Sequence, residues 1–408
     1  MDGARPGNVI RRQPHSTRRS PLEAAVALAL LIIAYWAFSA TRSPSNVSRA
    51  NSGGGCNFPA IFNFGDSNSD TGGKSAAFHR IPYPNGVTFF GKPSGRYSDG
   101  KVILDFVAEK LGLPYLTAYL DSIGANFRHG ANFATGGSTI EPLNTRIFQG
   151  GYSPISLDIQ LWQFEQFKAR TLELHEEGSS YAKTGLPRPE DFGKALYTID
   201  IVQNDLHSAL ESMTEEQMLE LLPSLTTRLA GAVDKLYQQG ARAFWIHNTG
   251  PIGCLPFSVI TYPPEPNNVD GNGCVASHNE IAQALNRLLK DQVSKLRLRL
   301  PDAKLNFIDL YSVRYSLISE AKKHGFADPL GCCCGRYGDR HFDCWKKAVV
   351  NGTEISLTPC RDPLKVISWD GVHYSHAANE WAAERIINGS LSDIHVPLLE
   401  SCPNPASP

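Results

Sequence analysis

Short apolar runs alternate with amphipathic stretches along most of the chain. Runs typical of buried strands occupy residues 59–64, 195–202, 243–247 and 305–310. Between them, leucine and valine recur at helical spacing over residues 225–236 and 281–300, and Gly240 and Pro301 follow as stop signals. This alternation of strand and helix predicts right-handed crossovers and an α/β fold with a central parallel sheet.

The amino terminus carries a different pattern. An apolar run over residues 24–40 follows five arginines, Arg5, Arg11, Arg12, Arg18 and Arg19. Its length suits a short membrane span or the core of a signal peptide. Three features favour a retained anchor. The basic segment is long, the aromatic residues Tyr35, Trp36 and Phe38 lie at the far end of the apolar run, and bulky residues surround the best cleavage pair. Positive-inside bias then places the arginines in the cytosol and the remainder in a lumen; a cleaved signal peptide is the alternative.

These patterns divide the chain into five parts. Residues 1–21 form a basic tail and residues 22–40 the signal-anchor helix. Residues 41–57 are rich in Ser, Asn and Gly, a composition typical of a flexible stem. The folded domain is predicted over residues 58–400, and residues 401–408 form a short tail.

Composition narrows the classes of protein to which the chain can belong. Of its 408 residues, 42% are hydrophobic and 10% aromatic, which is enough for a sizeable core. Lys and Arg number 39 against 40 Asp and Glu, and this balance argues against a basic nucleic-acid footprint over the whole chain. In a lumen, the sequons at Asn46, Asn351 and Asn388 become candidate glycosylation sites.

Candidate chemistry follows the first predicted strand, at Gly65, Asp66 and Ser67. Active sites of parallel sheets gather at the carboxyl ends of strands, where a serine can expose its hydroxyl. A serine hydroxyl is a poor nucleophile unless a base removes its proton. From these three residues alone, an Asp/Ser helix cap is the better interpretation.

A possible base lies near the other end of the chain. Asp370 precedes His373 by three residues, so its carboxylate can hold one ring nitrogen while the other nitrogen faces a hydroxyl. On their own, these two residues are better explained as a surface ion pair. His376 can compete for either role, although we expect it to cap a helix that continues through residues 379–385.

Two further segments are suited to stabilising an anion. The glycine-rich turn at residues 130–138 can offer backbone N–H groups, and it matches neither a P-loop nor a dinucleotide-binding motif. After the second predicted strand, Asn204 places a side-chain amide between Gln203 and Asp205. In chain order, these blocks supply a nucleophile, a glycine turn, an amide and an Asp–His pair.

With its blocks in this order, the chain resembles the GDSL esterase/lipase family, also called SGNH hydrolases, and specifically the plant branch of that family. The resemblance covers roughly residues 58–400. It extends to four more segments, residues 84–91, 95–100, 156–160 and 247–256. It implies a three-layer α/β/α, flavodoxin-like hydrolase fold around the parallel sheet.

Carried over by position, the resemblance implies that Ser67 is the nucleophile, His373 the general base and Asp370 the carboxylate that orients the imidazole. The reaction implied is hydrolysis of a carboxylic ester through an acyl-enzyme, without a metal, a nucleotide or another cofactor.

The resemblance also implies an oxyanion hole made by the Ser67 N–H, the Gly137 N–H and the Asn204 side chain, with Gly136 as an adjacent alternative. One position departs from the family. The third block usually reads Gly-x-Asn-Asp, and here Val202 stands in place of the glycine. A side chain at this tight strand end can shift Asn204 or narrow the pocket.

The nine cysteines all lie after residue 50, and their odd number leaves at least one thiol unpaired if the others form intramolecular bridges. The cysteines and His341 within residues 332–344 can be imagined as a zinc site, but their spacing fits no pair of Cys-x-x-Cys knuckles. Because the lumen is oxidising, we expect disulfides. The expected pairs are Cys254 with Cys274, and one of Cys332, Cys333 and Cys334 with Cys344 or Cys360.

The predicted anchor bears on the substrate. A short span suits a thin membrane, which predicts a single-pass type II Golgi protein with a lumenal catalytic domain. Acetylated matrix polysaccharides such as xylan are assembled there in plants, so we expect an acetylesterase that removes O-acetyl groups from such a polymer. The alternatives are a secreted carboxylesterase or lipase acting on small or lipid esters, an acyltransferase with a sugar hydroxyl as acceptor, and a weakly catalytic carbohydrate-binding relative. The expected partners are the ester substrate and the membrane, with no nucleic acid; the oligomeric state is left open.

Overall fold

The computed structural model describes residues 56–143, 151–335, 344, 347–350 and 353–402. The predicted tail and anchor, nearly all of the stem, and two of the three sequons, at Asn46 and Asn351, lie outside the described residues. Within these described ranges, no helix combines the length and apolar character needed to cross a bilayer. The third sequon residue, Asn388, is exposed at the end of the last long helix.

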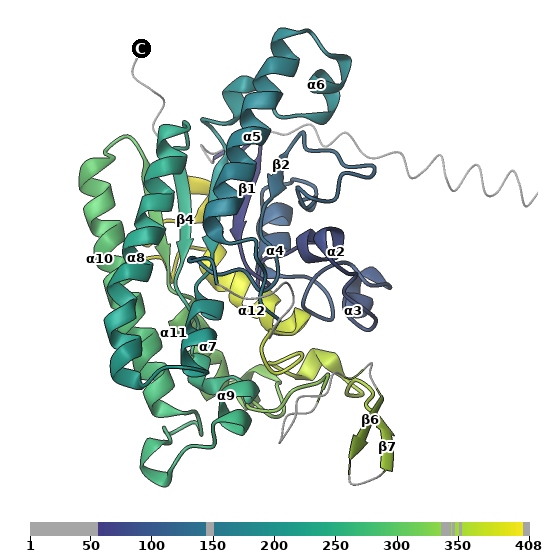
Figure 1. Cartoon of the computed structure of the whole chain (residues 1–408), viewed down its shortest axis with the longest axis vertical. Helices are drawn as coiled ribbons and strands as arrows, with labels where there is room; N and C mark the ends of the chain where they lie inside the picture. The colour runs from purple at the N-terminus through teal and green to yellow at the C-terminus, as the bar shows by residue number, and fades with distance from the viewer. Residues whose placement is uncertain (1–55, 144–150, 336–343, 345–346, 351–352, 403–408) are drawn as a thin grey trace, which may run out of the picture. The chain divides into compact units, whose positions relative to one another are not determined.

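Five parallel strands form the central sheet in the order β2-β1-β3-β4-β5 (Figure 1). Their bounds are Ile61–Gly65 (β1), Gly130–Asn132 (β2), Leu196–Asp200 (β3), Ala243–His247 (β4) and Lys304–Ile308 (β5). This is the flavodoxin-like strand order, in which the chain runs from β1 to one side and then crosses back to the other. The predicted parallel sheet is therefore confirmed.

Four of these strands either lie within the apolar runs that predicted them or are shifted from those runs by one or two residues. The last residues of two runs, however, belong to the helices that follow. The run at residues 195–202 leaves the sheet at Asp200, and Val202 already caps the next helix. The run at residues 305–310 ends in Leu310, the first residue of a helix. Apolar character continues past both strands because these residues are buried under the helices that follow.

The interpretation of residues 130–138 as a turn throughout is wrong for the first three of them. Gly130–Asn132 is the edge strand β2, which pairs in parallel with β1 and places Gly130 opposite Ile61. A Cβ at Gly130 would lie 1.8 Å from the Ile61 carbonyl oxygen, and the residue has a φ of +102°. Glycine is thus required at the first position of a strand that is too short to show an apolar alternation.

Helices cover both faces of the sheet and complete the three layers (Figure 1). One face is covered by α5, α8 and α10, and the other by α4, α11 and α12. Alternate strand residues point to opposite faces, so Phe62 packs with the first group and Ile61 with the second. The helix bounds are Gly73–Ala77 (α2), Val87–Phe90 (α3), Ile103–Lys110 (α4), Leu157–Glu176 (α5), Ser180–Gly185 (α6), Gln203–Leu210 (α7), Glu215–Gln238 (α8), Pro256–Thr261 (α9), Ala276–Arg299 (α10), Leu310–Ser319 (α11) and His376–Ile387 (α12).

Helix α8 begins well before the stripe that predicted it. Thr214 caps it, since the Thr214 side chain accepts a hydrogen bond from the Gln217 N–H and the Gln217 side-chain oxygen accepts one from the Thr214 N–H. The helix then passes through Pro223, which the sequence pattern treats as a breaker. Its buried stripe packs on α10, and tertiary packing thus outweighs the local signal.

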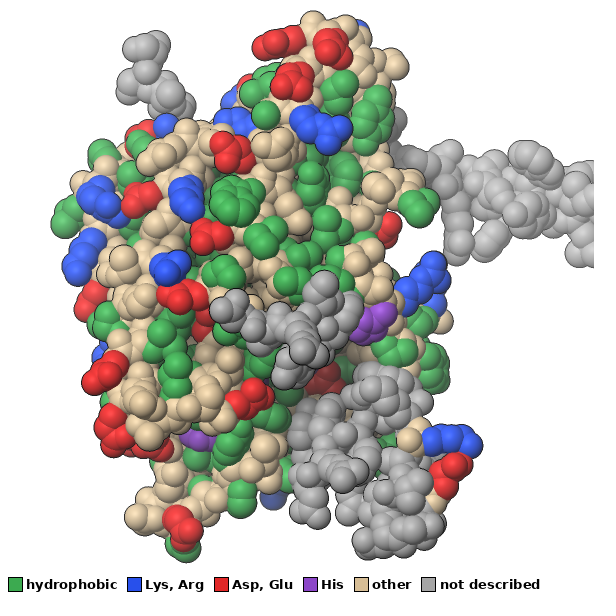
Figure 2. All heavy atoms as spheres, viewed as in Figure 1, with side chains coloured by type: hydrophobic (Ala, Val, Ile, Leu, Met, Phe, Trp, Pro, Cys, Tyr) green, Lys and Arg blue, Asp and Glu red, His purple; other side chains and the backbone are tan. Residues whose placement is uncertain are grey.

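The outer surfaces of these helices carry charges of both signs. Lys235 of α8 pairs with Asp158 of α5 at 3.0 Å, and Arg299 of α10 pairs with Asp234 of α8 at 2.8 Å. On the face drawn in Figure 2, acidic and basic side chains are interspersed over α8 and α10. Such exposed pairs contribute at most about 1 kcal/mol each to stability, so the buried apolar stripes hold the layers together.

Four disulfides join the cysteines that the structure describes. The predicted pair Cys254–Cys274 is confirmed, and two of the three adjacent cysteines are paired rather than one. A further bridge, which cysteine spacing did not predict, joins the first and last cysteines and closes the domain. Among the described cysteines, Cys332 is the free thiol. The remaining bridges are Cys56–Cys402, Cys333–Cys360 and Cys334–Cys344. Because these sulfurs are oxidised, they are unavailable as thiolate ligands of zinc.

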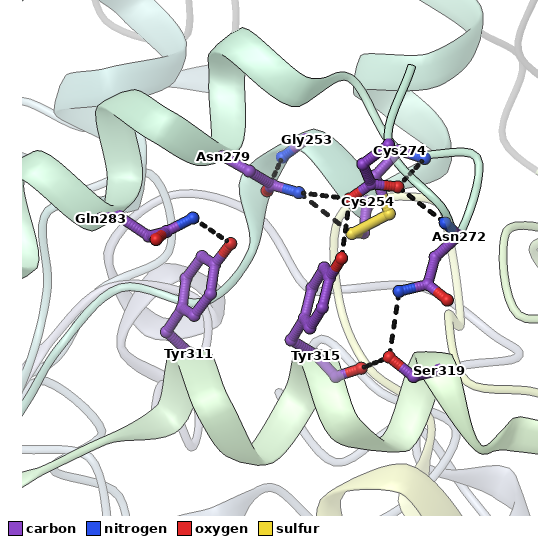
Figure 3. Close-up of a disulfide and its surroundings, with 10 residues drawn as sticks. Gly253, Cys254, Asn272, Cys274, Asn279, Gln283, Tyr311, Tyr315 and Ser319 are labelled. Carbon is purple, nitrogen blue, oxygen red and sulfur yellow. Dashed lines mark hydrogen bonds between the residues drawn. A yellow bond between two sulfur atoms is a disulfide. The ribbon is translucent and has the colours of Figure 1, made fainter.

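The Cys254–Cys274 disulfide joins the short turn after β4 to the hydrogen-bonded loop between α9 and α10 (Figure 3). Asp270 accepts the N–H of Cys274 at 2.9 Å and the hydroxyl of Tyr315 at 3.0 Å. Asn279 of α10 accepts the Gly253 N–H at 2.9 Å. This bridge therefore ties the residues after β4 to α10 and α11, and its role is structural. Beyond it, Lys347–Val350 (β6) and Thr353–Ser356 (β7) form an antiparallel hairpin that the sequence analysis did not predict.

Candidate active site

Ser67 lies directly after β1, at the carboxyl edge of the sheet. The preceding backbone is held by Gln160 of α5, whose side chain accepts the Gly65 N–H at 2.9 Å and donates to the Gly65 carbonyl at 2.8 Å. A Cβ at Gly65 would lie 2.3 Å from the carbonyl oxygen of Asp200 at the end of β3. Glycine thus lets β1 and β3 end side by side at the crevice where flavodoxin-like folds bind ligands.

The structure brings Ser67, His373 and Asp370 together. Ser67 Oγ lies 2.7 Å from His373 Nε2, and His373 Nδ1 lies 2.6 Å from Asp370 Oδ2. The other oxygen, Asp370 Oδ1, accepts the backbone N–H groups of His373 at 2.8 Å and of Val372 at 3.0 Å. The carboxylate is therefore fixed by the loop that also carries the histidine.

Burial alone would raise the pKa of Asp370, but the His373 imidazole and the hydrogen bonds from His373 and Val372 lower the pKa below its ordinary value. The carboxylate therefore stays ionised beside the imidazole. Ser67 is 6% exposed and His373 is 9% exposed. In such a dry site, the interactions among these side chains are stronger than they would be in water.

The imidazole of His373 is held from two sides. The ring packs against Tyr97, with ring centroids 4.7 Å apart. The backbone carbonyl of His373 accepts the Trp369 backbone N–H at 2.8 Å. Trp369 is buried and donates its indole N–H to Asn85 at 2.9 Å. The segments around Tyr97 and Asn85 are two of those that carried the family resemblance, and here they support the loop that carries His373.

His376 is separate from this row. Its Nδ1 accepts the Lys101 N–H at 3.0 Å, and its ring stacks on Phe89 with centroids 5.5 Å apart. The prediction that it caps the helix is wrong, because Ser375 is the N-cap of α12 and accepts the Ala378 N–H at 3.1 Å. The serine hydroxyl can reach a free N–H of the first turn, as an N-cap requires.

The structure distinguishes the two candidate glycines of the turn. The Gly136 N–H donates to Asp70 Oδ2 at 2.7 Å, so it is already engaged. The Gly137 N–H has no acceptor among the described residues. Gly137 has a φ of +86°, and a Cβ there would lie 2.3 Å from the Gly151 carbonyl oxygen. Gly137 is thus the glycine of the pair with a donor to offer.

Asp70 was not singled out by the sequence analysis. Its carboxylate accepts the N–H groups of Gly72 at 2.7 Å, of Lys74 at 3.0 Å and of Gly136, so it joins the Ser67 loop to the glycine turn. Burial raises the pKa of Asp70 even though these N–H groups lower it. The only local signal was an acidic residue ahead of two glycines, which does not reveal a partner on another strand.

Helix α7 connects to the same turn. Asn204 Nδ2 donates to the Ser138 carbonyl at 2.9 Å. The next residue, Asp205, accepts the Ile140 N–H at 3.0 Å. The side chain of Gln203 accepts a hydrogen bond from Asn68 Nδ2 at 3.2 Å. The first turn of α7 therefore contacts both the glycine turn and the Ser67 loop.

Val202, the residue that departs from the family pattern, has a strained backbone but does not displace Asn204 from the glycine turn. It is the N-cap of α7 with a φ of +106°, a backbone conformation that favours glycine. Its side chain is 1% exposed and packs in the core. Asn204 still contacts the glycine turn, so the valine keeps the backbone in a glycine-like conformation at a cost in strain.

A buried acidic pair lies behind Ser67. Burial and the charge of Asp200 raise the pKa of Asp66 well above its ordinary value. Burial would also raise the pKa of Asp200, but His247, 3.3 Å away, and Arg314 lower it. The two pKa values are thus shifted in opposite directions, which favours the protonated form of Asp66 and the ionised form of Asp200.

Comparison with known proteins agrees with this geometry. The family described as GDSL-like Lipase/Acylhydrolase matches residues 61–386. A GDSL esterase/lipase of Arabidopsis thaliana is 52% identical over 351 residues, covering 85% of this chain and 90% of the relative. A protein named Esterase from Hevea brasiliensis is 49% identical over 353 residues (85% and 90%), and one named Alpha-L-fucosidase 3 from Arabidopsis thaliana is 47% identical over 340 residues (82% and 91%). The chain belongs to the GDSL-like lipase/acylhydrolase family.

Proposed function

We propose that this protein is a serine carboxylester hydrolase that forms an acyl-enzyme on Ser67. The observation that carries the proposal is the row of hydrogen-bonded side chains from Ser67 through His373 to Asp370, at the carboxyl edge of the sheet. Membership of an esterase/lipase family supports the same reaction class. A serine with an adjacent base and an orienting carboxylate is the arrangement that acyl transfer requires.

In the first half of the reaction, His373 Nε2 accepts the proton of Ser67 as Oγ attacks the ester carbonyl carbon. Collapse of the tetrahedral intermediate breaks the bond to the alcohol oxygen, and His373 returns the proton to that oxygen. In the second half, His373 takes a proton from water, which attacks the acyl carbon; the bond from that carbon to Ser67 Oγ then breaks, the acid leaves, and His373 returns the proton to Ser67 Oγ. Asp370 remains ionised throughout and stabilises the imidazolium.

The negative charge that develops on the carbonyl oxygen needs donors. We assign this role to the N–H groups of Ser67 and Gly137 and to the side-chain amide of Asn204. The amide nitrogen of Asn204 carries two hydrogens, and the Ser138 carbonyl engages one, so one remains for the substrate. Loss of one such donor typically reduces the rate by about 10²–10³.

For the substrate, we propose an O-acetyl group on a plant cell-wall polysaccharide such as xylan. Support comes from the amino-terminal pattern, which predicts a Golgi anchor, and from a 47% identical relative whose name refers to a sugar. That relative's name also suggests a glycosidase. Most glycosidases use a pair of carboxylates, whereas here a single ionised carboxylate acts behind a histidine and a serine.

The test uses the purified full-length chain and its Ser67→Ala variant. Rates are measured with 4-nitrophenyl acetate, butyrate and palmitate, with acetylated xylan, and with 4-nitrophenyl α-L-fucoside. We expect release of acetate from both acetyl esters, lost in Ser67→Ala. Preference for palmitate would contradict the polysaccharide substrate and leave the ester chemistry in place. Fucoside hydrolysis that survives Ser67→Ala, without ester hydrolysis, would contradict the reaction class.

The location is tested separately. We propose a single-pass type II protein of the Golgi membrane, because the basic residues precede the apolar run. A carboxyl-terminal fluorescent fusion should stay with Golgi membranes after carbonate extraction and resist protease added outside sealed vesicles. Secretion of a processed chain that begins near Thr41 would contradict the anchor.

A further inference from the structure

We infer that His207 is a specificity-determining residue that hydrogen-bonds a hydroxyl group on the alcohol portion of the ester. Its Nε2 is buried and has no hydrogen-bond partner among the described residues, and its side chain is not used in the mechanism above. The inference rests on the proposed esterase function and adds to it the residue that recognises the polyhydroxylated leaving alcohol.

Its position on α7 places His207 beside the reacting groups. It follows Asn204 by three residues and Gln203 by four, so the three side chains share one face of the helix. Asn204 contacts the glycine turn and Gln203 contacts Asn68, the residue after the nucleophile. The face that carries His207 is therefore the face turned toward the site.

A second contact connects His207 to the loop of the catalytic base. Its ring lies against Phe257 of α9, with ring centroids 5.0 Å apart. The Phe257 N–H donates to the Gly371 carbonyl at 3.0 Å, within the loop that holds Asp370 and His373. Through Phe257, His207 of the helix that carries Asn204 is thus linked to the loop that carries His373.

The free nitrogen is fully enclosed in the unliganded chain. As whole residues, His207 and Ser67 are buried to the same degree, each 6% exposed. A buried polar atom without a partner destabilises the free enzyme, and a hydrogen bond made only to the bound substrate removes that penalty.

The imidazole is neutral at any pH at which the enzyme would work. Burial, followed by the nearby His373 and His278, lowers the pKa of His207 to about 3. A neutral ring offers one donor and one acceptor, which suits a hydroxyl group. It also adds no positive charge beside His373, which must become an imidazolium during the reaction.

The acyl side of an acetyl ester cannot supply the partner. An acetyl group has no polar atom except the carbonyl oxygen, and the oxyanion donors engage that oxygen. The partner of His207 Nε2 must then come from the alcohol.

The experiment compares His207→Phe, which keeps a ring against Phe257 and removes the hydrogen bond, with His207→Gln, which keeps a donor and an acceptor. Two acetyl esters are used, methyl 2-O-acetyl-β-D-xyloside and 4-nitrophenyl acetate, and only the first has hydroxyl groups on its alcohol. We expect His207→Phe to lower kcat/KM for the xyloside by about tenfold or more, mainly through KM, and to change the phenyl ester by less than about twofold. His207→Gln should recover part of the loss.

His278→Phe is the matched control. His278 is also buried with an unpaired ring nitrogen, but its ring contacts Tyr262 rather than Phe257. It should leave the ratio between the two esters unchanged. Equal losses on both esters in His207→Phe, no loss on either, or no partial recovery in His207→Gln would overturn the inference, because packing alone would explain such results.

The outcomes separate this inference from the function on which it rests. If the wild-type chain cleaves 4-nitrophenyl acetate in a Ser67-dependent manner but not the acetyl xyloside, the inference about the alcohol is overturned and the esterase stands. If it cleaves neither ester, the proposed function fails as well.

Discussion

Ser67 and His373 are separated by 306 positions in the chain, yet Ser67 Oγ lies 2.7 Å from His373 Nε2. Ser67 follows the first strand of the sheet, and His373 belongs to the loop before α12, one of the helices on the face opposite α5. Only the closed three-layer fold brings the two side chains together. The contact can form only if β1, β3 and α12 occupy their observed places.

The first prediction concerns this contact. Ser67→Ala or His373→Ala should lower the rate of ester hydrolysis by several orders of magnitude, because either change removes the nucleophile or its base. Asp370→Asn should cost roughly one to two orders less than either, since the remaining pair still functions. Steady-state kinetics on 4-nitrophenyl acetate, with circular dichroism to verify folding, provide the measurement.

A control for the histidine change is His129→Ala, which removes an exposed histidine outside the site. It should leave the rate of ester hydrolysis unchanged. Near-normal turnover by folded Ser67→Ala would show that another residue is the nucleophile.

A second prediction follows from the backbone of Val202, which has a φ of +106°. Replacing it with glycine or alanine removes the two buried γ-methyl groups, but only glycine also removes the Cβ and so relieves the strain. Val202→Gly should therefore be more stable than Val202→Ala by about 1 kcal/mol. Urea unfolding at fixed pH measures the free energy of unfolding of both.

The same pair of changes at Val233 serves as the comparison, because Val233 is buried in the regular helix α8. There alanine should be the more stable variant by about 1 kcal/mol. An alanine variant at least as stable as the glycine variant at position 202 would contradict the strain.

The third prediction concerns pH and Asp205. Burial raises the pKa of this carboxyl to about 7, although hydrogen bonds from the Ile140 and Glu141 N–H groups partly offset the rise. From the ordinary value near 3.8 up to about 7, the folded chain holds a proton that the unfolded chain has lost. The free energy of unfolding that this group contributes therefore falls as pH rises through that window and is level above it.

Asp205→Asn removes the titration and keeps the shape. The stability of the wild-type chain relative to this variant should decline from pH 4.5 to pH 7 and then remain constant, as followed by urea unfolding at several pH values. Parallel pH profiles for the two proteins would show that the carboxyl is not held protonated.

The fourth prediction concerns the bridge between Cys56 and Cys402, which are 346 positions apart in the chain. Cross-linking the two ends of the domain restricts the unfolded chain, so Cys402→Ser should reduce the free energy of unfolding by about 2–5 kcal/mol. Thermal unfolding measured without reductant gives the comparison with the wild-type chain.

Cys332→Ser is the control for the bridge, because Cys332 is the free thiol among the described cysteines. It should change the melting temperature little. A Cys402→Ser variant as stable as the wild-type chain would mean that the bridge adds nothing to the closure of the domain.

Much of the fold was readable from the sequence because local patterns report burial. Parallel strands are covered on both faces and appear as nearly continuous apolar runs, as β4 does at residues 243–247. The small residues of β2 give no such run, so this strand was missed. The start of α8 was missed for a related reason, since its first two turns are mostly exposed and Pro223 follows them.

The chemistry of the site was also present in the sequence, as residue types in a particular order. Ser67, the Asp370–His373 pair and Asn204 were identified before any fold was known, since each belongs to a short recognisable block. The sequence also identified Val202 as a departure from the family, although it did not reveal that the consequence is backbone strain.

The tertiary structure decided which groups are free to act. It engaged the Gly136 N–H with Asp70 and left that of Gly137 without a described acceptor. It also separated His376 from His373 and left His207 Nε2 without a partner among the described residues. Each outcome depends on contacts between segments far apart in the chain. The order of the strands sets such contacts, and the spacing of residues along one segment does not encode that order.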